Sequence, residues 1–358
     1  MKEKTVTGVC NTMHMSVFRY GLLGGVILVG VLFFIFNSSQ TANTEILFSE
    51  VQKNIATPSS ARVVTVSEKI KLPVLGSSPT ENVKHSIPIE EVRQGCRNQD
   101  CIPSVDNPEF MNVEQATAVV PATSIGIALS YKGEERFYPF PMLETHELVN
   151  DVVAGDALLI SYCPLCGTGI VFNRTVGDEV YEFGVSGMLW QSNLLMYNRA
   201  ESLENRNLWS QVLGEAVIGK ETGVILSVVT SDIMKFENWT SQHPNGKVLN
   251  TGTPRDPYRG EYYEVAKRFA PNFNEQDSVL KPDAYVYGIL YADTYKAYPR
   301  DILPEGTIHD MISGEGITIE NIDGRVSFLD SDGNTISDVE GFWFSWSAVH
   351  PETEVWSN

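Results

Sequence analysis

The chain has 358 residues, of which 42% are hydrophobic, and this is enough for one large domain or two ordinary ones with a substantial core. Its 45 acidic residues outnumber the 26 basic ones and give a formal net charge of -19. A surface of this sign repels phosphate backbones and anionic headgroups. We therefore expect no nucleic-acid partner and no docking of the folded part on an acidic lipid surface.

An uncharged apolar segment at residues 20–36 differs from the rest of the chain. It reads YGLLGGVILVGVLFFIF, which is at the short end of the length that spans a bilayer. Lysines and an arginine precede it and acidic residues follow it. The positive-inside bias thus predicts a cytoplasmic segment at residues 1–19, a single-pass anchor in the cell membrane at residues 20–36, and the bulk of the chain outside the cytoplasm. A cleaved signal peptide and a buried core helix are the alternatives.

The part after this segment divides into a tether and two related halves. Residues 37–86 are rich in Ser, Thr, Asn, Val and Pro without a helical period, which is typical of a tether. Beyond them, an apolar run ending in Tyr-Pro and a later Trp-x-x-x-His-Pro motif each occur twice in the same order. The copies are Tyr138-Pro139 and Tyr298-Pro299, then Trp239 to Pro244 and Trp346 to Pro351. We predict a larger half at residues 87–250 and a shorter, degenerate repeat at residues 251–358, with His243 and His350 as packing residues.

Apolar runs flanked by Gly, Asp and Asn predict a strand-rich chain. The expected strands lie at residues 125–131, 135–139, 157–162, 169–173, 179–185, 194–198, 224–229, 285–291, 316–321 and 325–329. Short helices are expected at residues 140–151, 231–242 and 341–349. The sequence therefore predicts a strand-dominated α+β fold, built from two unequal related halves that follow an N-terminal membrane anchor.

Cys163 and Cys166 form a Cys-Pro-Leu-Cys-Gly motif between two β-prone runs. In thioredoxin-like enzymes such a pair begins a helix, but Gly167 and Gly169 make a poor helix start here. A pair of cysteines in a turn between two strands is typical of a metal knuckle, with zinc or copper as the candidate ion. The alternatives are a redox-active dithiol, in which Cys163 attacks and Cys166 resolves, and a passive disulfide.

Three further residues are candidates for the same centre. Cys96 and Cys101, with four residues between them, favour a loop-closing disulfide, with a second pair of metal ligands as the alternative. His146 shares a face of the expected helix with Asn150, and the strand that carries Cys163 follows closely. His146 is thus a candidate third ligand or general base, with a hydrogen-bonded structural histidine as the alternative. Polar residues of the insert that follows the motif, Ser192, Asn193 and Gln211 among them, are candidate pocket walls.

These motifs together resemble a family of bacterial and archaeal exported proteins that is catalogued only as a domain of unknown function. Its signature is Cys-Pro-Leu-Cys-Gly-Thr. The resemblance rests on His146-Glu-Leu-Val-Asn-Asp151, Tyr162-Cys-Pro-Leu-Cys-Gly-Thr168, Phe183-Gly-Val-Ser-Gly187, Leu208-Trp-Ser-Gln211 and Trp239 to Pro244, and it covers residues 93–357. It implies an exported, often membrane-attached protein without an activity to carry over. Thr145 and Gly169 depart from the tryptophan and alanine that the resemblance leads us to expect.

The leading prediction is a membrane-anchored extracytoplasmic protein with a cysteine-based metal-binding centre formed by Cys163, Cys166 and His146. A thiol–disulfide oxidoreductase that uses Cys163 and Cys166 is the first alternative. A non-catalytic binding module held by structural disulfides is the second. Whether the protein is an enzyme stays open at this point, as do its substrate, its partners and its oligomeric state.

Overall fold

The computed structural model describes residues 75, 83–252, 262–322 and 324–357. The segment expected to anchor the chain, residues 20–36, and most of the expected tether lie outside these ranges. Within the described ranges, no helix is long and apolar enough to cross a membrane.

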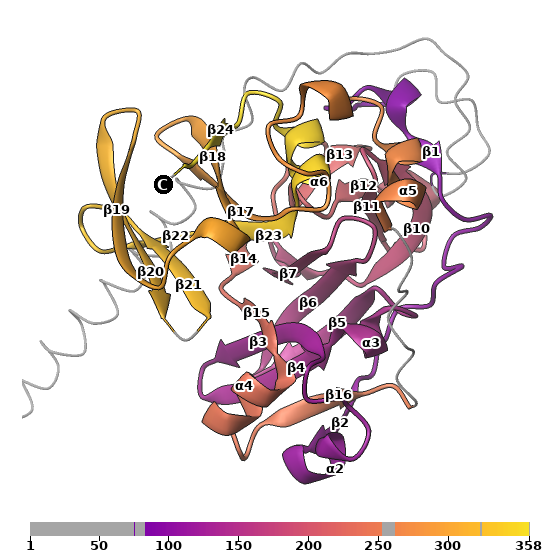
Figure 1. Ribbon diagram of the computed structural model, residues 1–358. Helices are drawn as coiled ribbons and strands as arrows, with labels where there is room; N and C mark the ends of the chain where they lie inside the picture. The colour runs from indigo at the N-terminus through magenta and orange to yellow at the C-terminus, as the bar shows by residue number, and fades with distance from the viewer. Residues whose placement is uncertain (1–74, 76–82, 253–261, 323, 358) are drawn as a thin grey trace, which may run out of the picture. The chain divides into compact units, whose positions relative to one another are not determined.

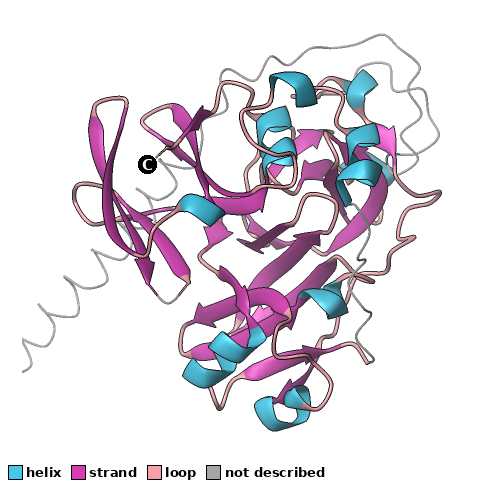
Figure 2. Ribbon diagram, viewed as in Figure 1, coloured by secondary structure: helices cyan, strands magenta, loops and turns pink. Residues whose placement is uncertain are grey.

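Strands account for 45% of the described residues and helices for 16%, and the sheets are arranged as a five-bladed β-propeller (Figures 1 and 2). The predicted α+β class is therefore wrong. The expected helix at residues 140–151 illustrates the reason. Its second part belongs to a strand, Leu148–Val153, and every residue of this strand pairs with Asp156–Cys163. The apolar and β-branched side chains of this strand pack well on a sheet. The helices that remain are too short to form a layer of their own.

Five sheets of four or five strands form the blades and are called sheets 1 to 5. Sheet 1 has the order β15 (Asp232–Lys235), β3 (Ile125–Tyr131), β4 (Glu134–Pro139), β16 (Lys247–Asn250) and β2 (Glu109–Asn112). Sheet 2 has the order β14 (Val228–Val229), β7 (Thr168–Asn173), β6 (Asp156–Cys163) and β5 (Leu148–Val153). Sheet 3 has the order β1 (Arg93–Gln94), β10 (Phe183–Trp190), β11 (Asn193–Asn198), β12 (Leu208–Ser210) and β13 (Glu215–Ile218).

The remaining two sheets come from the C-terminal part of the chain. Sheet 4 has the order β23 (Asp338–Phe342), β17 (Tyr285–Tyr291), β18 (Thr294–Pro299) and β24 (Glu354–Val355). Sheet 5 has the order β19 (Gly306–Ile312), β20 (Glu315–Ile322), β21 (Arg325–Leu329) and β22 (Thr335–Ile336). A small hairpin joins β8 (Thr175–Val176) to β9 (Glu179–Val180). The α-helices are α2 (Val113–Thr117), α3 (Phe140–Leu143), α4 (Phe236–Gln242), α5 (Tyr262–Ala266) and α6 (Trp343–Val349).

Sheets 1 and 2 have the same strand order as sheets 4 and 5. The order β15-β3-β4-β16 corresponds to β23-β17-β18-β24. In each sheet the second strand of the hairpin, β4 or β18, pairs with a parallel neighbour, β16 or β24. The order β14-β7-β6-β5 corresponds in the same way to β22-β21-β20-β19. The paired sequence landmarks therefore occupy matching places in two related units.

The two matched histidines, His243 and His350, are the C-cap residues of helices α4 and α6. His243 and His350 follow α4 and α6, and the N–H of each donates to the carbonyl of the tryptophan four residues earlier over 2.9 Å. The ring of His350 stacks on Tyr295 with centroids 3.9 Å apart, and its burial lowers its pKa to about 3. His350 is therefore uncharged at neutral pH, as a packing residue should be.

Sheet 3 has no counterpart in the second unit, because its strands β10 to β13 are inserted between β7 and β14. Its buried side chains share one core with the cysteine hairpin, in which Cys166 and Phe172 lie among Phe183, Met196 and Trp209. Strand β23 of sheet 4 runs along β7 on another side, and the N–H of Phe342 donates to the carbonyl of Cys166 over 2.8 Å. The cysteine pair thus lies where sheets 2, 3 and 4 meet.

Candidate functional site

The Cys-Pro-Leu-Cys motif forms the tight turn of the β6–β7 hairpin. Strand β6 ends at Cys163, β7 begins at Thr168, and these two residues are paired across the hairpin. The N–H of Cys166 donates to the carbonyl of Cys163 over 3.1 Å, and Gly167 adopts a positive φ of 67°. A Cβ at Gly167 would also lie only 2.9 Å from the ring of Phe342. A strand, and no helix, therefore follows the second cysteine, as the two glycines of the motif predict.

The two sulfur atoms lie side by side in the interior. Cys163 and Cys166 are free cysteines, 2% and 0% exposed, with their Sγ atoms 2.6 Å apart. The carbonyl oxygen of Ser192, in the β10–β11 turn, lies 3.2 Å from the Sγ of Cys166. The side-chain amide of Asn193 donates to the same sulfur over 3.5 Å. Sheet 3 thus supplies the polar neighbours of a thiol pair that sheet 2 carries.

A buried network of hydrogen bonds fixes the Asn193 amide. Its Nδ2 donates to Oε1 of Gln211 over 2.8 Å, and the hydroxyl of Thr168 donates to the same oxygen over 2.7 Å. The amide nitrogen of Gln211 donates in turn to the hydroxyl of Ser161 over 3.2 Å. All four side chains are at most 2% exposed. Because buried amides and hydroxyls are costly to leave without partners, this network holds the amide in one orientation beside Cys166.

The surroundings shift the pKa values of the two thiols in opposite directions. Burial acts to raise the pKa of Cys166, but hydrogen bonds, first from Cys163 and also from Asn193, outweigh it and lower the pKa. Burial raises the pKa of Cys163, and the hydrogen bond to Cys166 and the charge of Cys166 raise it further. The pair therefore holds one thiolate more readily than two, and Cys166 is the thiol that ionises first.

Glu147 is a buried acid beside the pair. It precedes β5, its carbonyl accepts a hydrogen bond from the N–H of Tyr162 over 2.7 Å, and its φ is positive at 58°. The residue after Tyr162 is Cys163, so the backbone places Glu147 against the end of β6. Burial raises the pKa of Glu147 to about 8, with the charge of Cys166 as the second cause. Sequence reasoning misses Glu147, although it adjoins His146, because the pattern of the segment predicts a helix.

The imidazole of His146 is hydrogen-bonded outside the cysteine pair. Its Nδ1 lies 2.8 Å from the carbonyl oxygen of Pro103, which makes it a hydrogen-bonded structural histidine. Across the described ranges no group of three or more His, Cys, Asp or Glu side chains is placed to hold a metal ion. The predicted metal-binding centre of Cys163, Cys166 and His146 is therefore wrong. The tight turn suits two thiols, but no described His, Cys, Asp or Glu side chain adds a third ligand to them.

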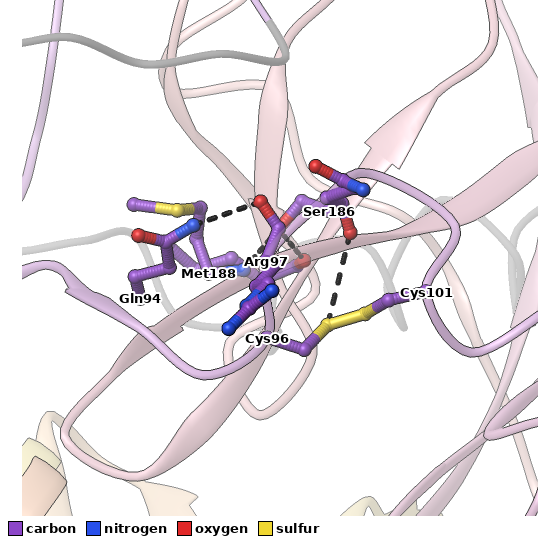
Figure 3. The surroundings of a disulfide bond; sticks show 8 residues. Gln94, Cys96, Arg97, Cys101, Ser186 and Met188 are labelled. Atoms are coloured by element: carbon purple, nitrogen blue, oxygen red, sulfur yellow. Dashed lines mark hydrogen bonds between the residues drawn. A yellow bond between two sulfur atoms is a disulfide. The ribbon is translucent and has the colours of Figure 1, made fainter.

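Cys96 and Cys101 form a disulfide of their own. Figure 3 shows this bridge on the loop that follows β1, where the amide of Gln94 donates to the carbonyl of Arg97 over 2.9 Å. The bridge closes a short loop and does not join the Cys163–Cys166 pair. Of the two interpretations of Cys96 and Cys101, the loop-closing disulfide is the one that the structure has.

A short segment of the chain lies over the β10–β11 turn. The N–H of Ser192 donates to the carbonyl of Phe269 over 2.8 Å, and its hydroxyl donates to the carbonyl of Ala266. Leu165, between the two cysteines, packs beside the cluster of Ala266, Ala270 and Phe344. Residues 262–273 therefore help to exclude water from the sulfur atoms.

No curated protein and no solved structure matches the chain. A family model described as "Protein of unknown function (DUF3179)" matches residues 99–333, which is more than half of the chain and includes the Cys163–Cys166 hairpin, Glu147 and most of sheets 1 to 5. The chain belongs to this family of proteins of unknown function, DUF3179.

Proposed function

We propose that Cys163 and Cys166 form a buried thiol–disulfide redox centre. The observation that carries the proposal is the 2.6 Å separation of two free Sγ atoms. Two thiols at this distance can join with little movement of the backbone. The lowered pKa of Cys166 supports the proposal, because the thiolate is the form that attacks a disulfide.

The external oxidant is a disulfide, either of a small thiol compound or of a protein. The Cys166 thiolate attacks one sulfur of this disulfide, forms a mixed disulfide and releases one thiol. The Cys163 thiol then loses its proton and attacks the Sγ of Cys166, which closes the Cys163–Cys166 bond and releases the second thiol. Two electrons pass from the cysteine pair to the external disulfide, and the reverse sequence reduces the pair.

Glu147 is the proton acceptor in the second step. While Cys166 is a thiolate, its charge and the burial of Glu147 keep the acid protonated near neutral pH. Formation of the mixed disulfide removes that charge, so the pKa of Glu147 falls and its proton passes to the thiolate released in the first step. The Glu147 carboxylate then takes the proton of Cys163 as Cys163 attacks Cys166, and it passes this proton to the second leaving thiolate. An acid that loses its proton only when the first step is complete couples the two steps.

The burial of both sulfur atoms bears on how a partner reaches them. A disulfide must approach the attacked sulfur directly, and the two cysteines are at most 2% exposed. We expect the cysteine pair to become accessible when residues 262–273 separate from Ser192, because this movement breaks two hydrogen bonds. We therefore expect exchange to be limited by opening and not by the chemistry of the thiolate.

The proposal is tested by redox titration of the purified protein. Samples are equilibrated in glutathione buffers of graded potential, and the Cys163–Cys166 disulfide is quantified by alkylation and mass spectrometry after proteolysis. We expect a reversible transition in the range of known redox-active pairs, from about -270 to about -120 mV. A potential below about -300 mV would identify a static structural disulfide and contradict the proposal.

Variants assign the roles of the two sulfurs. Cys163→Ser and Cys166→Ser each remove the transition, and the Cys96–Cys101 disulfide serves as the internal control. The ultraviolet absorbance of the thiolate should titrate at a lower pH in Cys163→Ser than in Cys166→Ser, because only the first variant keeps the Asn193 contact. The opposite order would remove Cys166 from the attacking role.

A further inference from the structure

A second candidate site is a cavity of about 30 Å³ beside β7 and its neighbour β14. Residues of β7, β14, β15, β22 and β23 and of the loops that follow β14 and β22 line it. Figure 1 labels these strands. Its apolar wall is formed by Ile170, Val228, Val229 and Ile233. Its polar wall is formed by the hydroxyls of Thr230, Ser231, Thr335 and Ser337 and by the carboxyls of Asp338 and Glu340. The redox proposal does not use this cavity.

One carboxyl oxygen at the cavity has no hydrogen-bond donor. Glu340 is 9% exposed, and its Oε1 accepts from the N–H of Ile233 over 3.1 Å. Its Oε2 is buried without a hydrogen bond from any described residue, and the nearest cation, Nη1 of Arg300, is 3.8 Å away. A buried carboxylate oxygen in this condition carries a free-energy penalty that a donor placed in the cavity would relieve.

When all the carboxyls around the cavity are ionised, the site carries one negative charge in excess. Three carboxyls contribute, from Asp338 and Glu340 on β23 and Asp232 on β15, against two guanidinium groups, from Arg300 and Arg325. Arg325 is already paired with Asp232 over 2.6 Å. The other titratable groups near Glu340 are the phenols of Tyr285 and Tyr287, and the charge of Glu340 helps to raise both of their pKa values. A ligand that matches the site therefore carries one positive charge.

The chemistry of the wall narrows the ligand class. Carboxylates accept hydrogen bonds and the four hydroxyls can accept them, so a group rich in donors fits better than an acceptor. A cavity of about 30 Å³ has room for two water-sized groups. An alkyl carbon next to the charge would rest against the apolar wall.

We propose that this cavity binds the primary ammonium group of a small amine, with Glu340 as the principal acceptor and Asp338 beside it. The ammonium head donates to the Oε2 of Glu340 and to the hydroxyls of the wall, and the first carbon of the amine contacts the isoleucine and valine side chains. When all three carboxyls are ionised, the bound ammonium group makes the site charge-neutral; in the empty site, protons take its place.

Proton release is the first test. Burial and then the charge of Asp338 raise the pKa of Glu340 to about 8, and burial and then the charge of Asp232 raise that of Asp338 to about 7. Methylammonium, which like lysine stays charged to about pH 10, must displace these protons when it binds at neutral pH. Calorimetric titration of the full chain in buffers of different ionisation enthalpy should show proton release, and the affinity should fall about tenfold for each pH unit below the carboxyl pKa.

Matched ligands and variants complete the test. Tetramethylammonium has the same charge but no N–H donor and should not compete, and sodium chloride at equal ionic strength should not raise the melting temperature as methylammonium does. Glu340→Gln should weaken methylammonium binding about thirtyfold or more, and Asp338→Asn should weaken it less. Glu315→Gln, an exposed position on neighbouring β20, should bind as the native chain does.

The proposal is overturned if methylammonium does not bind, if tetramethylammonium binds equally well, or if binding releases no proton. Should Glu340→Gln fail to fold, proton release by the native chain and the response of Asp338→Asn still decide the matter. Unchanged binding in a folded Glu340→Gln variant would place the amine elsewhere and overturn the assignment. None of these outcomes depends on the redox state of the cysteine pair.

Discussion

The hydroxyl of Tyr138 donates to the carboxylate of Asp151 over 2.6 Å in the interior of the first unit. The guanidinium of Arg136 donates to the same carboxylate oxygen over 2.6 Å. In the second unit, Asp310 accepts from the hydroxyl of Tyr298 and pairs with Lys296, each over 2.7 Å. The Tyr-Pro landmark of the repeat therefore marks a buried tyrosine–aspartate link between two sheets.

Replacement of Asp151 by Asn should lower the free energy of unfolding by about 1–3 kcal/mol, because Arg136 and Tyr138 lose a charged acceptor while Glu134 still pairs with Arg136 over 2.7 Å. Chemical denaturation measures this loss. Asp310→Asn is the matched control and should lose less, since the Asp310 side chain is 17% exposed against 3% for Asp151. Equal losses would mean that burial does not set the strength of the link.

Replacement of Glu147 by Gln should change how stability depends on pH. The pKa of Glu147 is raised from 4.5 to about 8, so the folded chain holds a proton that the unfolded chain releases. This group therefore lowers stability as the pH rises from about 4.5 to about 8, by at most about 1.4 kcal/mol per pH unit. Denaturation at several pH values should show a shallower decline for Glu147→Gln. Parallel curves would contradict the raised pKa.

Replacement of Gly167 by Ala should disturb the cysteine turn. The change strains a positive φ and brings a methyl group to 2.9 Å from Phe342, so we expect a loss above the roughly 1 kcal/mol that strain alone costs. Gly177→Ala is the control, because its φ is 60° and no atom lies within 4 Å of the added carbon. Combination with Phe342→Ala should recover part of the Gly167→Ala loss. Additive losses would rule out the clash.

Replacement of Ser192 by Ala should speed the reaction of the cysteine pair with alkylating reagents. The hydroxyl donates to the carbonyl of Ala266, and loss of one such bond, about 1 kcal/mol, should favour opening about fivefold. Ser241→Ala, which removes an exposed hydroxyl on α4, should leave the rate unchanged. A rate that does not respond to Ser192→Ala would place the route to the sulfurs elsewhere.

Removal of the Cys96–Cys101 bridge should cost about 2 kcal/mol of stability, because the loop it closes is short. The double serine variant, compared with the native chain by denaturation, measures this cost. The redox transition of Cys163 and Cys166 should keep its midpoint in the variant. A shifted midpoint would show that the two pairs are coupled.

Local patterns in the sequence predict the hairpins well. Strands β3, β17 and β21 begin and end where the apolar runs do, and the cysteine turn lies between two strands as its glycines indicate. The helix predicted at residues 140–151 is confirmed at Phe140–Leu143 and wrong beyond it, because the period of Leu148 to Val153 fits a helix face as well as a strand. Pairing with β6, which no local pattern reports, decides for the strand.

The candidate site could be predicted only in part, since its parts come from distant segments. Cys163 and Cys166 are visible as a motif, and Asn193 and Gln211 are candidates for its surroundings from their place in the insert. Glu147 could not be recognised, because its proximity depends on the pairing of β5 with β6 and on its own backbone turn. The failed metal site has the same origin, because His146 lies in a turn before β5 where the pattern predicts a helix.

The matching strand order of the two units separates what the architecture needs from what chemistry needs. The hairpin β20–β21 holds the place in the second unit that β6–β7 holds in the first, and it contains no cysteine. The same arrangement of strands thus closes this bend without sulfur. We therefore expect the scaffold to tolerate the loss of the two thiols, as the redox role proposed for Cys163 and Cys166 requires.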